Sequence, residues 1–282
     1  MTALTTNEHP PATPAAVAAP TTALGALSRL IDQVSVITWR NLMRNVRLPQ
    51  LLVFATIQPV MFLLLFNYVF GGAIQAGGAQ GGSYIDFLLP GLIVQTSLFG
   101  ATQTTIGLTE DLASGAIDRF RSLPIARSSV LAGRTLSDLI RNIFVMALMT
   151  AVGVILGFRL GGSILGGLAG FALVLAFSFA FSWVMASVGL AVKNSEAAQA
   201  AGFLAVFPLS FASSVFVPTR SMPGWLQVFT EHQPVTIVAN AVRGLTAGAA
   251  SGGDITLAVA WIVGIFVVAV PLAVSLYRRA AE

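Results

Sequence analysis

Continuous apolar runs alternate with short polar segments along most of the chain. The runs cover residues 51–70, 87–108, 139–158, 168–192, 197–217 and 255–276. About 20 apolar residues in a helix cross a hydrocarbon layer of ~30 Å. The strands of a membrane barrel would instead alternate apolar and polar positions. The pattern therefore predicts an all-α polytopic membrane fold with six transmembrane helices.

Two segments before the first run have different patterns. Residues 1–24 are rich in Pro, Ala and Thr and contain no Lys or Arg, which indicates a disordered cytoplasmic tail and not a signal peptide. Residues 25–48 place apolar and basic side chains on different helical faces, with Trp39 available for the headgroup region. This pattern predicts an amphipathic helix in the membrane interface. An ordinary basic segment beside the membrane fits the same residues.

Two short helical patterns lie between the fifth and sixth runs. Pro223 and Pro234 stand at first-turn positions, and Gly244 or Gly248 stands at a stop. Each helix is too short to cross the bilayer, so residues 218–250 are expected to form a re-entrant hairpin on the outer side. Such a hairpin requires protein to cover its ends. A pair of helices on the outer surface is the alternative.

The composition makes lipid the solvent for most of the chain. Of the 282 residues, 56% are hydrophobic and 9% are charged, whereas a soluble domain carries about a quarter charged residues. With a cytoplasmic N-terminus, three of the 15 Lys and Arg residues fall outside, namely Arg159, Arg220 and Arg243, and the other twelve fall inside. This bias predicts cytoplasmic N- and C-termini. Because the arginines lie at the ends of runs, the net charge of +4 does not indicate nucleic-acid binding.

The chain lacks the usual residues of an enzyme site. Its single lysine, Lys193, follows no glycine-rich loop, so no P-loop for ATP is present. The two histidines, His9 and His232, suggest no metal cluster, and there is no cysteine. We therefore predict no catalytic residue and no metal site. No acid or base is expected in the middle of a span, which disfavours a proton- or sodium-coupled transporter.

The most heavily charged stretch, residues 110–134, lies between the second and third runs. Its arginines fit the positive-inside rule, but acids contribute little to topology. The acids are Glu110, Asp111 and Asp118. Phe120 and Leu123 beside arginines suit a protein interface, and Pro124 separates two short helices. We expect a docking element for a cytoplasmic partner, although a loop that only fixes topology is the alternative.

Polar side chains inside apolar runs are costly in lipid and are therefore candidates for a substrate path. Together with aromatic residues suited to an amphiphilic cargo, the candidates are Gln58, Asn67, Gln95, Phe99, Gln103, Phe207 and Phe211. Hydrogen bonding between helices is the alternative role for the polar residues. Packing or lipid contact is the alternative role for the phenylalanines.

Four motifs in order carry a resemblance to a known family. They are YIDFLLPGLI at 84–93, EDLASGAIDRFRSLPIARSSVLAGR at 110–134, VGLAVKNSEAAQA at 188–200 and FVPTRSMPGWLQVFTEHQPVTIVANAVRGL at 216–245. From about residue 30 to its C-terminus, the chain resembles the permease subunits of type-2 ABC exporters, in particular the actinobacterial daunorubicin and doxorubicin resistance branch. His232-Gln233-Pro234 departs from the Asn-Pro of many members.

The resemblance implies a dimer with a second copy or a homologous permease, and each permease would dock on a cytoplasmic P-loop ATPase. The ATPase would bind ATP and Mg, and this chain would bind no cofactor. Residues 49–282 would form the transmembrane domain, 25–48 the connecting helix and 109–137 the coupling loop. The implied coupling residues are Glu110, Gly115, Asp118, Arg119, Phe120, Arg121, Leu123, Pro124 and Arg127, with Lys193 and Glu196 as a candidate second cytoplasmic contact. The implied external gate residues are Pro223, Trp225, His232, Pro234, Asn240 and Arg243.

The expected function is that of a permease subunit in an ATP-driven exporter of a bacterial plasma membrane. The expected cargo is a hydrophobic or amphipathic, drug-like compound. An exporter of a lipid or glycolipid with the same architecture is the alternative. A secondary transporter or a membrane scaffold is disfavoured, because the spans lack carboxylates and the 110–134 stretch suits docking.

Overall fold

A computed structural model describes residues 23–47, 49–72, 83–113, 127–192 and 194–280. All regular secondary structure in these ranges is helical, as the sequence predicts. The N-terminal tail lies outside the described residues up to position 22. The same holds for most of the predicted docking residues, namely Gly115, Asp118, Arg119, Phe120, Arg121, Leu123, Pro124 and Lys193.

The described helices follow the order of the apolar runs. They are α1 (Ala23–Arg47), α2 (Pro49–Leu65) with the π-helical η1 (Phe66–Phe70), α4 (Tyr84–Ala113), α6 (Arg127–Ile155), α7 (Ile164–Val192), α8 (Ser195–Phe211), the 3-10 turn η2 (Thr219–Ser221), α9 (Gly224–His232), α10 (Pro234–Ala247) and α11 (Gly252–Ala280). In the described part of the chain, four helices are long and apolar enough to cross a membrane: α4, α6, α7 and α11. A shorter apolar helix covers Thr56–Phe70, and α8 has 17 residues.

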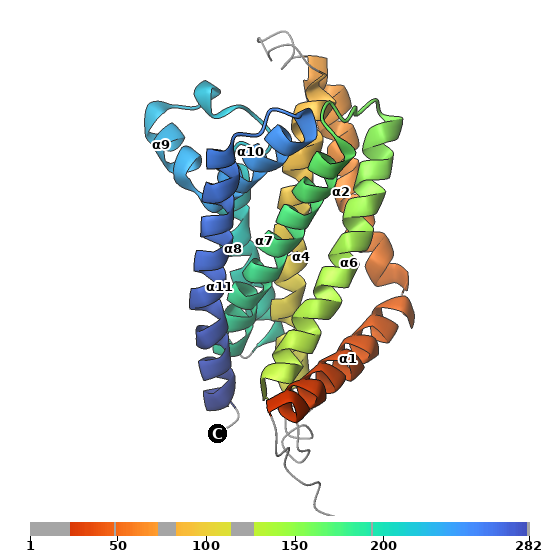
Figure 1. Ribbon diagram of the computed structural model, residues 1–282, viewed down its shortest axis with the longest axis vertical. Coiled ribbons are helices and arrows are strands. Elements are labelled where there is room, and N and C mark those ends of the chain that lie inside the picture. Colours follow the sequence, from red (N-terminus) through yellow and green to blue (C-terminus); the bar gives the residue numbers. More distant parts are fainter. Residues whose placement is uncertain (1–22, 48, 73–82, 114–126, 193, 281–282) are drawn as a thin grey trace, which may run out of the picture.

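The long helices run side by side, α1 crosses one end of the bundle, and α9 and α10 lie at the other (Figure 1). We call these the α1 end and the α10 end. The C-terminus of α11 lies at the α1 end. The predicted coupling loop 109–137 is helical on both sides of its undescribed part, because α4 extends to Ala113 and α6 begins at Arg127.

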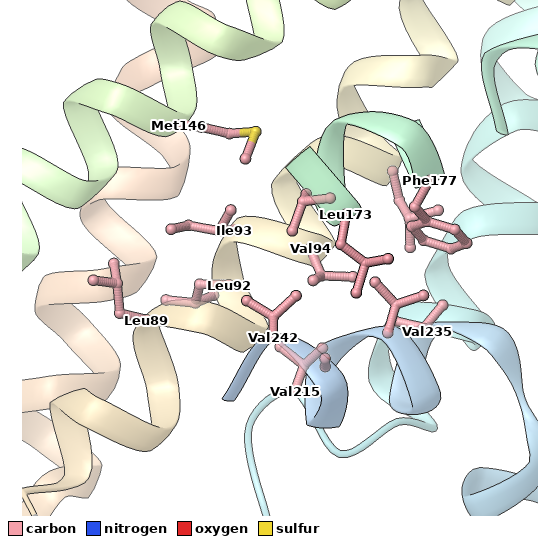
Figure 2. Close-up of a cluster of buried hydrophobic side chains, with 14 of the residues drawn as sticks. Leu89, Leu92, Ile93, Val94, Met146, Leu173, Phe177, Val215, Val235 and Val242 are labelled. Carbon is pink, nitrogen blue, oxygen red and sulfur yellow. The ribbon is translucent and has the colours of Figure 1, made fainter. Parts of the chain in front are cut away.

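Buried apolar side chains fill the space between α4, α6, α7 and α10 (Figure 2). Ile93, Met146, Phe177 and Val242 belong to this core. A second cluster joins α1, α4, α6, α7 and α11 at the α1 end and includes Ile37, Leu108, Leu131, Trp183 and Tyr277. Helix α4 contributes to both clusters and so connects the two ends of the bundle.

Helix α1 is amphipathic, as predicted, and one of its faces packs against α6. Ile37 and Thr38 are buried, and the Thr38 hydroxyl donates to the carbonyl oxygen of Gly133 in α6 at 3.2 Å. Ile31 and Trp39, which are also apolar, are exposed. A helix on the bundle end has one apolar side towards protein and another towards lipid, and the sequence pattern does not separate the two.

The α10 helix begins and ends where the sequence predicts. Pro234 is in its first turn, and Gly248 caps its C-terminus in the left-handed conformation with φ 75°. Pro223 is the N-cap of α9, one residue before its first helical position. The start of α7 packs closely on the end of α10, because a Cβ on Gly166 would lie 2.6 Å from the Leu245 carbonyl oxygen.

Candidate transport site

A cavity of about 90 Å³ lies between α2, α4 and α6, halfway along α4. Four of the seven predicted path residues line it, namely Gln58, Gln95, Phe99 and Gln103. The structure therefore brings together residues from two apolar runs that the sequence could only propose separately. Arg141 and Asn142 of α6 complete its polar wall.

Arg141 belongs to a buried ion pair with Asp138, and the two side chains are joined by an N–O distance of 3.6 Å. The Arg141 Nη2 also donates to the carbonyl oxygen of Gly100 at 2.7 Å, and the Thr104 hydroxyl donates to the Asp138 carboxylate. Each charge thus has a partner of opposite charge and a hydrogen bond, which a buried pair requires.

This pair corrects the prediction that no acid or base lies within a span. The run that we expected to begin at residue 139 is part of a longer candidate membrane span, Ser129–Ile155, which includes both residues. Arg141 is eight residues beyond Gly133, the contact point of α1, which corresponds to ~12 Å along the helix. Charged residues inside a helix bundle are tolerated when they pair with one another, and hydropathy does not register such pairs.

Two amide side chains line the cavity together with Arg141. The Asn142 amide donates to the Ser178 hydroxyl of α7 at 2.6 Å. Gly100 leaves room for it, because a Cβ there would lie 2.3 Å from the Asn142 Oδ1. Gln95 is 2% exposed, and its Nε2 has no hydrogen-bond partner in the described protein. The cavity therefore contains a buried polar group whose hydrogen-bonding capacity the protein does not use.

A column of phenylalanines in ring–ring contact extends from the cavity towards the α10 end. Ring centroids are separated by 6.3 Å for Phe99–Phe203, 5.0 Å for Phe203–Phe207, 4.3 Å for Phe207–Phe211, 5.2 Å for Phe211–Phe216 and 4.4 Å for Phe216–Phe66. None of these distances exceeds the separation at which aromatic rings are in contact. Phe66 also contacts Phe62, which lines the cavity, at 6.3 Å.

The column includes Phe207 and Phe211, as the sequence proposed, and both rings are 41% exposed. Asn67 lies in η1 beside Phe66 and is outside the cavity lining. The structure thus joins six of the seven predicted path residues in one continuous polar and aromatic feature. We call the phenylalanine part of this feature the aromatic column; its members are Phe66, Phe99, Phe203, Phe207, Phe211 and Phe216.

At the α10 end, Arg243 forms a node between three segments. Its Nε donates to the Phe87 carbonyl oxygen at 2.8 Å, and its Nη2 donates to the carbonyl oxygens of Ser214 at 2.7 Å and Val215 at 3.0 Å. Its Nη1 donates to the Ser214 hydroxyl and the Asn240 amide oxygen. The guanidinium also lies 3.7 Å from the Phe87 ring centroid. The Arg243 guanidinium is always charged, and each of the groups named here as its contacts is neutral.

The node fixes α10 to the first turns of α4 and to the segment that follows α8. Tyr84, the first residue of α4, reinforces this link because its hydroxyl donates to the Phe216 carbonyl oxygen at 3.1 Å. Of the predicted gate residues, the structure brings Asn240 and Arg243 together. Pro223 and Pro234 only begin helices.

The other two predicted gate residues, Trp225 and His232, are exposed on α9. Sequence reasoning missed the neighbouring Gln233, which is buried. Its amide donates to the carbonyl oxygens of Leu209, at 3.0 Å, and Ala212. This residue belongs to the His-Gln-Pro departure, so the departure provides a contact between the α9–α10 junction and the end of α8.

At the α1 end, Asp111 of α4 and Arg134 of α6 form an ion pair at 3.0 Å. The pair joins the helices that flank the charged stretch. Glu110 is partly buried in the last turns of α4, and Arg127 begins α6. Glu196 is exposed in the first turn of α8, where the Asn194 side chain caps the helix.

A bundle of long apolar helices around a polar cavity defines a helical membrane protein. Residues 32–246 match the model of the ABC-2 type transporter family, and the chain belongs to that family. The predicted resemblance to type-2 ABC permeases is thereby confirmed.

Individual relatives agree with this assignment. The chain is 34% identical over 241 residues to the daunorubicin resistance ABC transporter permease protein DrrB1 of Streptomyces coeruleorubidus, covering 86% of this chain and 84% of the relative. It is 29% identical over 228 residues to the probable doxorubicin resistance ABC transporter permease protein DrrC of Mycobacterium tuberculosis, covering 80% and 81%. It is also 26% identical to a putative transport permease, ycf38, of Cyanophora paradoxa, covering 76% and 73%.

Proposed function

We propose that this chain is the permease of an ATP-driven exporter and that its cargo moves along the cavity and the aromatic column. The observation that carries the proposal is their continuity: residues from α2, α4, α6 and α8 form one feature from mid-bundle to the α10 end. A polar recess followed by aromatic surface suits an amphipathic compound, because each part of such a compound meets a matching surface.

In the proposed membrane arrangement, α2 with η1 and α8 are the fifth and sixth spans beside the four long helices. Helix α2 has 17 residues and η1 has 5, which gives 22 in sequence and a length of ~33 Å. The outer hairpin is re-entrant through α10. Residues Val235–Ala239 and Ala241 are buried against the bundle, which supports re-entry because protein covers the helix.

We further propose that the α1 end is cytoplasmic and that the charged stretch docks on a P-loop ATPase, with Lys193 and Glu196 as a second contact. The Asp111–Arg134 pair supports this, since it fixes the two helices that would receive the movement. Two permeases and two ATPase copies would form the exporter in a bacterial plasma membrane. Rigid-body closure of the ATPase would then act on α4, which extends to the Arg243 node.

The proposed cargo is drug-like, as the names of the daunorubicin and doxorubicin resistance relatives suggest. A cavity of about 90 Å³ is smaller than the ~300 Å³ at which sites for whole drug-sized ligands begin. The cavity would therefore accept one polar part of the cargo. The aromatic column would contact the remaining apolar part.

Transport into inside-out vesicles that contain this chain and its ATPase tests the proposal. We expect ATP-dependent accumulation of a fluorescent aromatic amphiphile, and a rate about fivefold lower for Phe207→Ala, because aromatic contacts contribute ~0.5–1.5 kcal/mol. Phe266→Ala is the matched control, since Phe266 stacks on Phe179 outside the column. Equal rates for Phe207→Ala and the unaltered protein would refute the path. Transfer of a fluorescent phospholipid without accumulation of the amphiphile would identify a lipid exporter instead.

A further inference from the structure

We infer that the cavity beside Arg141 selects the hydrogen-bond-accepting oxygen of a polar group, such as a carboxylate, carboxamide or phosphate, over an ammonium group. The inference rests on the proposed function, because it names the part of the cargo that the cavity binds. It depends on three features of the cavity wall: an amide without a partner, a charged donor and a carboxylate that is directed elsewhere.

The amide is Gln95. It is 2% exposed, and a buried amide without a hydrogen bond destabilises the folded protein. The Nε2 has no partner in the described protein, although most buried polar groups have one. The Nε2 is a hydrogen-bond donor, so the ligand group that would bond to it is an acceptor oxygen. A ligand group that bonds to Gln95 would therefore remove an existing cost.

The charged donor is Arg141, whose side chain is 10% exposed and lines the cavity. A guanidinium carries five N–H donors and no acceptor. Its contacts with Asp138 and Gly100 fix its position. A ligand oxygen beside it can accept a charge-assisted hydrogen bond, whereas an ammonium would face a like charge.

The carboxylate of Asp138 does not offset this preference. Its two oxygens are engaged by Arg141 and by the Thr104 hydroxyl, and Asp138 is outside the cavity lining. The remaining polar residues of the lining are neutral: Gln58, Thr96, Gln103 and Asn142. The only charged side chain that the lining presents is therefore cationic.

The size of the cavity restricts what it can bind. About 90 Å³ corresponds to the volume of about three water molecules. A carboxylate, carboxamide or phosphate group fits this volume, and an aromatic ring system does not. Phe62 and Phe99 form the apolar part of the lining, so the body of an amphiphile would continue along the aromatic column.

Binding to the purified permease tests the inference without ATP or the ATPase. The probes share a dodecyl chain with one fluorophore and end in a carboxylate, a carboxamide or an ammonium. In maltoside micelles free of phospholipid, fluorescence anisotropy should show the carboxylate probe binding at least tenfold more tightly than the ammonium probe. The affinity of the carboxamide probe should lie between those of the carboxylate and ammonium probes, because its hydrogen bond to Arg141 involves one charged group and not two.

The Gln95→Met variant should weaken carboxylate and carboxamide binding about tenfold and leave the ammonium probe unchanged, since methionine has a similar volume and no strong donor. Gln199→Met, an exposed position on α8, is the matched control and should bind like the unaltered protein. Retained melting temperature would show that Gln95→Met is folded. Equal affinity for the carboxylate and ammonium probes, or unchanged binding in Gln95→Met, would overturn the inference. If the exporter transports cargo with ATP but the permease binds the probes without selectivity, only this inference is overturned. If the permease binds the probes selectively but no ATP-driven transport occurs, only the proposed function is overturned.

Discussion

Reversing the charge at both Arg119 and Arg121 should abolish the cargo-stimulated ATP hydrolysis of the exporter. Both residues belong to the 110–134 stretch, which we propose as the docking element for the ATPase. Coupling energies of close charge pairs across interfaces are ~1.5–7 kcal/mol, so replacing two cations with acids should lower ATPase affinity by at least about tenfold. The measurement is the ATPase rate of Arg119→Glu/Arg121→Glu in nanodiscs, with and without cargo.

The matched control is Arg278→Glu/Arg279→Glu at the end of α11. These side chains are exposed at the α1 end of the bundle, and the change in net charge is identical. The control should retain stimulation by cargo, whereas the Arg119/Arg121 variant should lose it at an unchanged melting temperature. Normal stimulation in the Arg119/Arg121 variant would remove the docking role from these arginines.

Replacing Arg243 with methionine should be the most destabilising single change at the α10 end. It would leave the carbonyl oxygens of Phe87, Ser214 and Val215 without the donor that now bonds them. Each buried unsatisfied group costs ~1–3 kcal/mol, so the total loss of unfolding free energy should reach at least ~3 kcal/mol. Thermal unfolding in detergent should therefore occur several degrees lower, and ATP-driven transport should be lost because α10 is no longer fixed to α4.

Arg159→Met is the matched control, because Arg159 is exposed and its backbone N–H, which bonds to Asp86 at 2.9 Å, is retained. The melting temperature of Arg243→Lys should fall between those of Arg159→Met and Arg243→Met, since an ammonium has three donors in place of the five of a guanidinium. A melting temperature of Arg243→Met equal to that of Arg159→Met would show that the node does not stabilise the α10 end.

The helices could be predicted from the sequence because their signals are local. Long apolar runs are sufficient to predict α4, α6, α7 and α11, and a first-turn proline with a terminal glycine gave the bounds of α10. The face of α1 that packs on α6 was not predictable, because Ile31 and Ile37 are equally apolar. Which of them contacts protein depends on the neighbouring helix.

The buried polar contacts depend on pairs that the sequence does not reveal. Arg141 was counted only among the cytoplasmic arginines and Asp138 was not singled out, yet each is held by a partner on α4 as well as by the other. Gln233 carried no signal beyond its departure from the family pattern. Hydropathy counts each residue by itself, so paired charges inside a helix bundle escape it.

The aromatic column was predictable in part. Phe203, Phe207 and Phe211 are four residues apart and therefore share one face of α8. Their contacts with Phe99 and Phe216 connect segments that are separated by many residues. Sequence spacing thus gave the helical face but not the path.

The most direct test of the central claim, that this chain is a permease driven by a separate ATPase, is the rate of ATP hydrolysis in three preparations. These are the purified chain, the purified ATPase and the two reconstituted together in nanodiscs. The account predicts no hydrolysis by the chain alone, a basal rate for the ATPase, and a rate in the assembly that rises when an amphipathic cargo is added. Hydrolysis by the chain alone, or an assembly that hydrolyses ATP at the rate of the isolated ATPase with and without cargo, would contradict it.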